Sequence, residues 1–66
     1  MDINVLFGEN VRNRRLSLRL SQEALANIAG IDRTYLPDIE KGKRNVSLVV
    51  ANKIAKALEL RLKDLL

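Results

Sequence analysis

The chain has 66 residues, which suffices for one domain, and a chain of this length buries only about 60% of the surface that its unfolded form exposes. It contains neither cysteine nor histidine, so its composition excludes a disulfide framework and the common zinc sites, and we expect no metal or other cofactor. Twelve lysines and arginines against eight acidic residues give a formal net charge of +4, which is modest but unevenly spread along the chain.

The composition also narrows the class of protein. No apolar run approaches the about 18 residues of a membrane span, and the N-terminus lacks a basic segment followed by an apolar signal core. We therefore expect a cytoplasmic protein with no membrane partner. Phe7 and Tyr35 are the only aromatic residues, too few for a stacking platform that binds single-stranded nucleic acid. Without histidine, cysteine or clustered acids, neither an enzyme nor a small-molecule site is expected.

The first expected helix spans residues 3–18. Apolar residues recur there at multiples of three to four residues, and Asp2 precedes them as a candidate cap. These apolar residues are Ile3, Phe7, Val11 and Leu18. The segment also carries one of two basic clusters. Such clusters are commonly solvated faces, and they indicate phosphate contact only where a motif supports it. The clusters are Arg12, Arg14, Arg15 and Arg19, and then Lys41, Lys43 and Arg44.

Residues 21–41 read as two short helices joined by a glycine turn, which is the core of a helix-turn-helix. Leu20 is an apolar plug before Ser21, which caps the first of these helices. Gly30 supplies the turn, Ile31 fills the corner, and Asp32 is placed to cap the second helix. Apolar residues on both helices are expected to face the core. They are Leu25, Ala26, Ile28, Ala29, Leu36 and Ile39.

Pro37 is a local anomaly, because it falls about five residues into the second helix of the motif. Proline has no backbone N–H, so it removes the helical hydrogen bond that this position would donate to the Arg33 carbonyl. One interpretation is a small kink or a helix that starts late. The other is that a freed Arg33 carbonyl and a bent axis aim the helix differently in a DNA groove.

The rest of the chain predicts two further helices. Residues 42–45 are turn-like, and Ser47 caps a fourth helix with apolar residues at helical spacing: Ala51, Ile54, Ala55 and Leu58. Leucines near the end suggest a short fifth helix, although Arg61 is a poor cap. The sequence therefore predicts an all-α fold, a compact five-helix bundle containing a helix-turn-helix, with residues 1–66 as a single DNA-binding domain.

The outer face of the motif's second helix points to double-stranded DNA. Arg33, Thr34, Pro37 and Asp38 are short or polar groups there that could reach base edges in a major groove. A purely structural helical bundle would not explain these polar residues at a groove-reading position.

With these elements, the chain resembles the Cro and phage-repressor (XRE-type) family of helix-turn-helix regulators over nearly its whole length. Within that family it looks most like the controller proteins of restriction-modification systems, through the residues Asp32, Arg33, Thr34, Tyr35, Leu36, Ile39, Glu40, Gly42, Lys43, Arg44 and Asn45. The resemblance implies the lambda-repressor-like fold, homodimerisation and binding to a palindromic operator. An antitoxin-type DNA-binding protein, whose main partner is another protein, is the alternative.

The resemblance also implies roles for single residues. Gln22 opens the motif where family members brace the helix against phosphate, and Arg33 and Thr34 occupy the base-reading start of the second helix. The planar fork of Arg33 suits the two acceptors of guanine. Tyr35 resembles a tyrosine that lies against DNA, although a half-buried packing ring fits equally, and Asp38 could accept from cytosine or repel misplaced phosphates. The residues expected to grip the phosphate backbone are Lys43, Arg44 and Asn45.

Other positions bear on folding and partners. Arg15 and Glu40 match a pair that ties the first helix to the end of the second motif helix in this family; an exposed pair contributes little and a buried one is costly to break. Arg14 and Arg19 depart from the family's apolar residue and glycine, which predicts a less regular docking of the first helix. Glu23 matches one acid of the patch with which activating relatives touch RNA polymerase.

Asn27 is neutral where that patch has its other acid, so activation or repression by occlusion stays open. The apolar end of the chain predicts the dimer contact, with ordinary core as the alternative for each residue. These residues are Leu62, Leu65 and Leu66.

Overall fold

The computed structural model describes residues 2–66, and every regular element within this range is helical. The four α-helices are α1 (Ile3–Ser17), α2 (Gln22–Ala29), α3 (Leu36–Glu40) and α4 (Leu48–Ala57). Two 3-10 helices complete the order, η1 (Arg33–Tyr35) before α3 and η2 (Leu62–Leu65) after α4. The all-α class with a helix-turn-helix is confirmed. The count of five helices is wrong, because the final apolar segment forms a single 3-10 turn where a fifth α-helix was expected.

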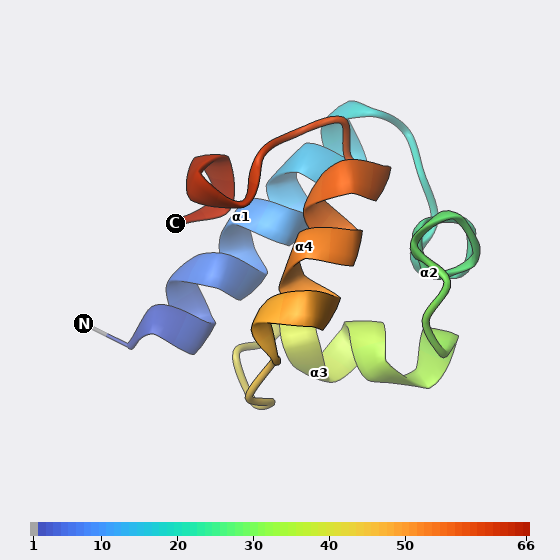
Figure 1. Ribbon diagram of the computed structural model, residues 1–66. Coiled ribbons are helices and arrows are strands. Elements are labelled where there is room, and N and C mark those ends of the chain that lie inside the picture. The colour runs from blue at the N-terminus through green and yellow to red at the C-terminus, as the bar shows by residue number, and fades with distance from the viewer. Residues whose placement is uncertain (1) are drawn as a thin grey trace.

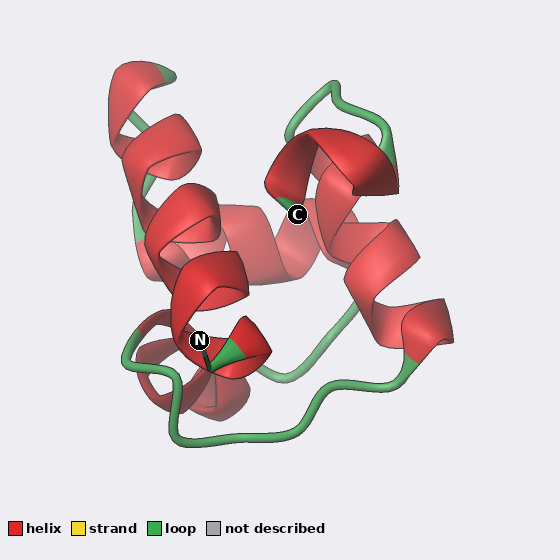
Figure 2. Ribbon diagram, turned by 90° about the vertical axis from the view of Figure 1, so that its left-hand side faces the viewer, coloured by secondary structure: helices red, strands yellow, loops and turns green. Residues whose placement is uncertain are grey.

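The helices surround one core (Figure 1). In that view α4 stands in front of α1, α3 crosses below both, and α2 is seen end-on beyond η1. The start of α1 and the element η2 lie on one side of the molecule, and this side faces the viewer in Figure 2. The core side chains are most of those that the helical spacing predicted on the four α-helices, together with Leu65 of η2. They are Phe7, Val11, Leu25, Ala26, Ala29, Leu36, Ile39, Ala51, Ile54, Ala55, Leu58 and Leu65.

The expected caps explain where the α-helices begin. The Asp2 carboxylate accepts a bond from the Asn4 amide at 2.9 Å, and α1 starts at the next residue. Ser21 and Ser47 cap α2 and α4 in the same way, through bonds of 3.0 and 3.1 Å from amides three residues on. Gly30 ends α2 with φ at +73°, a left-handed conformation that only glycine adopts without strain.

Two predicted core residues lie on the surface. Ile28 is 60% exposed, because α2 turns Leu25, Ala26 and Ala29 into the core and leaves Ile28 in a shallow groove beside Lys53 and Lys56. Ile3 is 56% exposed in the first turn of α1, where it lines a surface pocket together with Phe7 and Leu66. The helical spacing predicted the right face of each helix and overestimated its width.

Arg14 and Arg19 each have a definite place in the structure. The Arg14 guanidinium donates from Nε to the carbonyl of Leu58 at 3.1 Å, so it ties the end of α1 to the end of α4. Arg19 adopts a φ of 58°, the left-handed conformation that the glycine of relatives would adopt freely. The expectation of a looser α1 is therefore wrong for Arg14, whereas Arg19 retains the backbone geometry at some cost.

Gly8 permits a close approach between two helices. A Cβ at this position would collide with the backbone carbonyl oxygens of Ile39 and Glu40, at the end of α3. The absence of a side chain therefore lets α1 lie directly against the end of α3, and this contact sets the position of the motif's second helix.

Candidate nucleic-acid interface

The second helix of the motif consists of η1 followed by α3, and we call residues 33–40 the recognition helix. Pro37 lies in the first turn of α3, where the backbone N–H has no hydrogen-bond partner within the helix and its loss costs nothing. The interpretation of a late-starting α-helix is therefore correct. The alternative of a freed Arg33 carbonyl is wrong, because this oxygen accepts a bond from the amide of Leu36 in the 3-10 turn.

Asp32 fixes the first turn of the recognition helix. Its carboxylate Oδ1 accepts from both the amide and the hydroxyl of Thr34, each at 2.9 Å. The hydrogen bond from the Thr34 amide is the main cause that holds the pKa of Asp32 below its ordinary value. The hydrogen bond from the Thr34 hydroxyl contributes next, and the positive charge of Arg33 contributes least. The Thr34 hydroxyl donates its hydrogen bond to Asp32. The Thr34 side chain can therefore offer a base edge only the oxygen lone pairs, as an acceptor, and the methyl group.

Arg33 projects into solvent beside the start of α2. Its Nη1 lies 2.7 Å from Oε2 of Glu23, and the two side chains are 68% and 59% exposed. The pair bridges the two helices of the motif across the turn at Gly30. An arginine at this site has a planar fork of donors suited to the O6 and N7 acceptors of guanine.

The loop after α3 brings cations beside the recognition helix. The Arg44 guanidinium carbon lies 4.1 Å from the centre of the Tyr35 ring, a cation–π contact, and Tyr35 remains 40% exposed. The loop is attached at both ends, since the Lys43 amide donates to the Asp38 carbonyl at 2.9 Å and Asn45 accepts from the Asn4 amide group at 2.6 Å. The side chains of Lys43, Arg44 and Asp38 are exposed.

A buried ion pair supports the interface from behind. Arg15 donates from Nε to Glu40 Oε2 at 2.7 Å and from Nη2 to Oε1 at 2.9 Å, and the side chains are only 10% and 3% exposed. Arg15 also donates to the Leu20 carbonyl at 2.8 Å. The hydrogen bonds that Arg15 donates to Glu40 raise the pKa of Arg15, against the opposing effect of burial. The open question of exposure is thus answered, because this pair is buried and bidentate.

Gln22 completes the same network. Its side-chain amide donates to Glu40 Oε1 at 3.2 Å, which leaves one amide hydrogen free at the start of α2. Glu40 therefore joins α1, the start of α2 and the end of α3. This arrangement orients the element that carries Arg33 and Thr34 relative to the element that carries Gln22.

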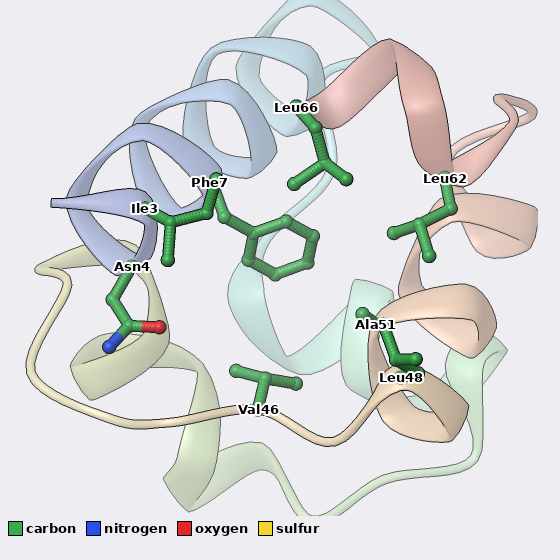
Figure 3. A pocket seen from close by; sticks show the side chains of 8 residues that line it. All are labelled: Ile3, Asn4, Phe7, Val46, Leu48, Ala51, Leu62 and Leu66. Atoms are coloured by element: carbon green, nitrogen blue, oxygen red, sulfur yellow. The ribbon is translucent and has the colours of Figure 1, made fainter. Parts of the chain in front are cut away.

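An apolar groove of about 220 Å³ opens on the opposite side from α2, between α1, α4 and η2. Figure 3 shows the side chains of Phe7, Leu62 and Leu66 directed toward its centre. Leu66 is 52% exposed at its rim, and Leu62 is half-buried. Leu65 is 1% exposed and packs in the core, which is the alternative that the sequence left open for each of the three leucines.

Several surface features were not predicted from the sequence. Leu48 and Val49 are 77% and 67% exposed in the first turn of α4. Val49 shares its helix face with Asn52, Lys53 and Lys56, and an apolar residue on such a polar face was the signal that could have found it. The contacts of Arg33 with Glu23 and of Arg44 with Tyr35 carry no such signal.

Among residues 2–66, no group of three or more acidic side chains is placed to hold a metal ion. Nor does any described helix have the length and apolar character needed to cross a bilayer.

Comparison with known proteins gives consistent matches. A helix-turn-helix family model, HTH_3, matches residues 11–65. The control protein C.BamHI of Bacillus amyloliquefaciens is 53% identical, over 98% of this chain and 82% of its own length. The control protein C.SmaI of Serratia marcescens is 46% identical, over 100% of this chain and 79% of its own. The crystal structure of the restriction-modification controller protein C.AhdI from Aeromonas hydrophila superposes with a TM-score of 0.91 at 44% identity, covering 96% of both chains.

Proposed function

The chain belongs to the HTH_3 helix-turn-helix family, and from this premise we propose that it is a transcriptional regulator that binds double-stranded DNA sequence-specifically as a homodimer on a palindromic operator. Its similarity to control proteins of restriction-modification systems supports the further proposal that it controls the genes of such a system.

One observation carries the proposal for DNA binding. Arg33 and Thr34 are exposed together at the start of the recognition helix, and the cations Lys43 and Arg44 lie exposed on the loop that follows it. A base-reading arginine flanked by phosphate-binding cations is what a major-groove reader needs, because phosphate contacts fix its register and base contacts give specificity. Two further residues are proposed to contact the phosphate backbone of DNA: Gln22, which has a free side-chain amide hydrogen, and Asn45.

The test compares Arg33→Ala with Lys43→Ala. Loss of a bidentate guanine contact should weaken operator binding by about 1–3 kcal/mol and abolish discrimination at one base pair in each half-site. Loss of Lys43 should weaken operator and random duplex by similar factors and reduce the salt slope by about one per subunit. Titration against operator, base-substituted operator and random duplex separates the two. Unchanged base preference in Arg33→Ala would show that this face does not read DNA.

We propose that a second copy of the chain covers the apolar groove. Leu66 at the groove and the neighbouring Leu48 and Val49 are exposed apolar side chains between α4 and η2, and contiguous exposed apolar residues of this kind mark interaction sites. A two-fold dimer would place two recognition helices in half-sites about one helical turn apart.

Sedimentation of Leu48→Asp combined with Leu66→Asp tests this dimer. Both side chains are exposed, so the variant should fold yet become monomeric and lose operator affinity. Ile28→Asp is the matched control, because Ile28 is 60% exposed on a different part of the surface and should stay dimeric. A folded double variant that remains dimeric would refute this contact.

A further inference from the structure

We infer that Glu23 is a positioning and specificity-determining residue, which holds Arg33 with one edge of its guanidinium open toward a base. The contact runs from Glu23 Oε2 to Arg33 Nη1 at 2.7 Å. No other side-chain hydrogen bond of Arg33 is present among the described residues. Nε and Nη2 form the opposite edge of the guanidinium, and they keep two parallel donors for the O6 and N7 of guanine.

Both partners are attached to backbone that the fold fixes. Glu23 lies in the first turn of α2, two residues after the Ser21 cap, and Arg33 directly follows the Asp32 cap. Gly30 sets the angle between these two helix starts. Arg33 on its own would be a long side chain, 68% exposed and free to sample many rotamers. The ion pair therefore preselects the rotamers in which the fork extends across the turn.

The charge of Glu23 has a second consequence for specificity. A carboxylate on Nη1 partly neutralises Arg33, which lowers its attraction for phosphate on any sequence. The two donors on the free edge still match guanine. Adenine presents an amino donor where guanine presents O6, so the same edge would meet adenine donor to donor. Glu23 thus reduces sequence-independent binding more than it reduces guanine binding.

This inference rests on the proposed reading of DNA by Arg33, and it gives Glu23 a role distinct from contact with RNA polymerase. The measured quantity is the ratio of affinities for the operator and for an operator substituted at the base pair that Arg33 reads. Ordering one flexible side chain in advance corresponds to about a two- to tenfold effect on this ratio.

The experiment uses the intact chain with Glu23→Ala, Glu23→Gln and the same changes in an Arg33→Ala background. Glu23→Ala should lower the ratio about two- to tenfold and make the salt slope on random duplex steeper by up to about one per subunit. Glu23→Gln keeps an acceptor at the same reach but loses the charge, so its ratio should fall between those of Glu23→Ala and the unaltered chain. In the Arg33→Ala background, Glu23→Ala should leave the ratio unchanged.

Glu59→Gln is the matched control for Glu23→Gln, because it removes the same charge at a distant site. Glu59 follows the C-terminal end of α4, and this end points away from α3 (Figure 1). It should change neither the ratio nor the salt slope. Circular dichroism checks that each variant is folded, so that a loss of α2 stability is not mistaken for the effect on one base pair.

The outcomes separate two failures. If Arg33→Ala loses discrimination while Glu23→Ala keeps it, the positioning role is refuted and base reading by Arg33 stands. Reduced polymerase-dependent transcription with unchanged DNA discrimination would assign Glu23 to the polymerase instead. If Arg33→Ala itself keeps discrimination, the proposed reading face is wrong, and the role of Glu23 falls with it.

Discussion

The buried pair of Arg15 and Glu40 makes a quantitative prediction about folding. Removing one partner of a buried ion pair strands the other charge, which costs roughly 3–5 kcal/mol. At roughly 0.05–0.15 kcal/mol per residue, a 66-residue chain has about 3–10 kcal/mol of total stability. Glu40→Ala leaves two guanidinium donors and the Gln22 amide unpaired, so it should remove a third of the free energy of unfolding or more, and in the least stable case all of it.

Urea unfolding, followed by far-ultraviolet circular dichroism, measures the effect through the midpoint and the slope. Glu23→Ala is the matched control. It breaks an ion pair of the same 2.7 Å length whose side chains are 68% and 59% exposed, and we expect a loss of about 1 kcal/mol or less. The contrast between the two variants isolates burial as the cause.

A second comparison separates the stranded charge from the lost attraction. Replacing both partners, Arg15→Met with Glu40→Leu, removes both charges and keeps similar volume, and such replacements are often neutral or stabilising. This double variant should be more stable than Glu40→Ala. The reasoning fails if Glu40→Ala costs no more than the exposed pair, or if the double variant is the least stable of the three.

Three further changes test other parts of the structure. Gly8→Ala should destabilise the chain by about 1–3 kcal/mol in thermal unfolding, because the new Cβ would collide with the Ile39 carbonyl. This loss outweighs the advantage of about 1 kcal/mol that alanine has over glycine in a helix. A gain in stability would refute the close contact of α1 and α3. Arg19→Gly should raise the free energy of unfolding by about 0.5–1 kcal/mol, since it relieves a φ of 58°, and a loss would show that the left-handed conformation carries little strain. The lowered pKa of Asp32 means that its ionised carboxylate stabilises the fold above the ordinary aspartate pKa of about 3.9, and that this contribution is lost as pH falls through the lower folded pKa. Asp32→Asn should therefore lose less stability than the unaltered chain over that acid range, and parallel pH profiles in urea unfolding would contradict the assignment.

Local sequence signals predicted the helix starts well, because each cap acts over only two or three residues. Ser21 and Ser47 bond to amides three positions on, and such bonds depend on little else in the chain. Pro37 illustrates the limit of this approach. Its ring predicts a disturbance, yet the choice between a kink and a late start depends on whether the preceding residues form a 3-10 turn, which the Asp32 cap and the core contact of Leu36 decide together.

Burial at the edges of helices could not be predicted from spacing alone. Ile28 follows the apolar period of α2, but its exposure depends on how far α4 extends beside it. Leu65 and Leu66 are adjacent leucines, and only the path of η2 sends the first into the core and leaves the second at the groove. The sequence identified the apolar chain end and could not divide it between core and surface.

The position of the candidate DNA face depends on groups that lie behind it. Glu40 ends the recognition helix, and it is held by Arg15 of α1 and by Gln22 at the start of α2. The same carboxylate therefore links the end of the helix that carries Arg33, the proposed base reader, to the start of α2, the proposed phosphate contact. Because the packing of α1 at Gly8 fixes the other side of α3, a shift of α1 would move the recognition helix as a unit. Stability and the proposed reading of DNA consequently depend on one set of contacts, and a destabilising change at Arg15 or Gly8 should also reduce operator affinity in molecules that remain folded.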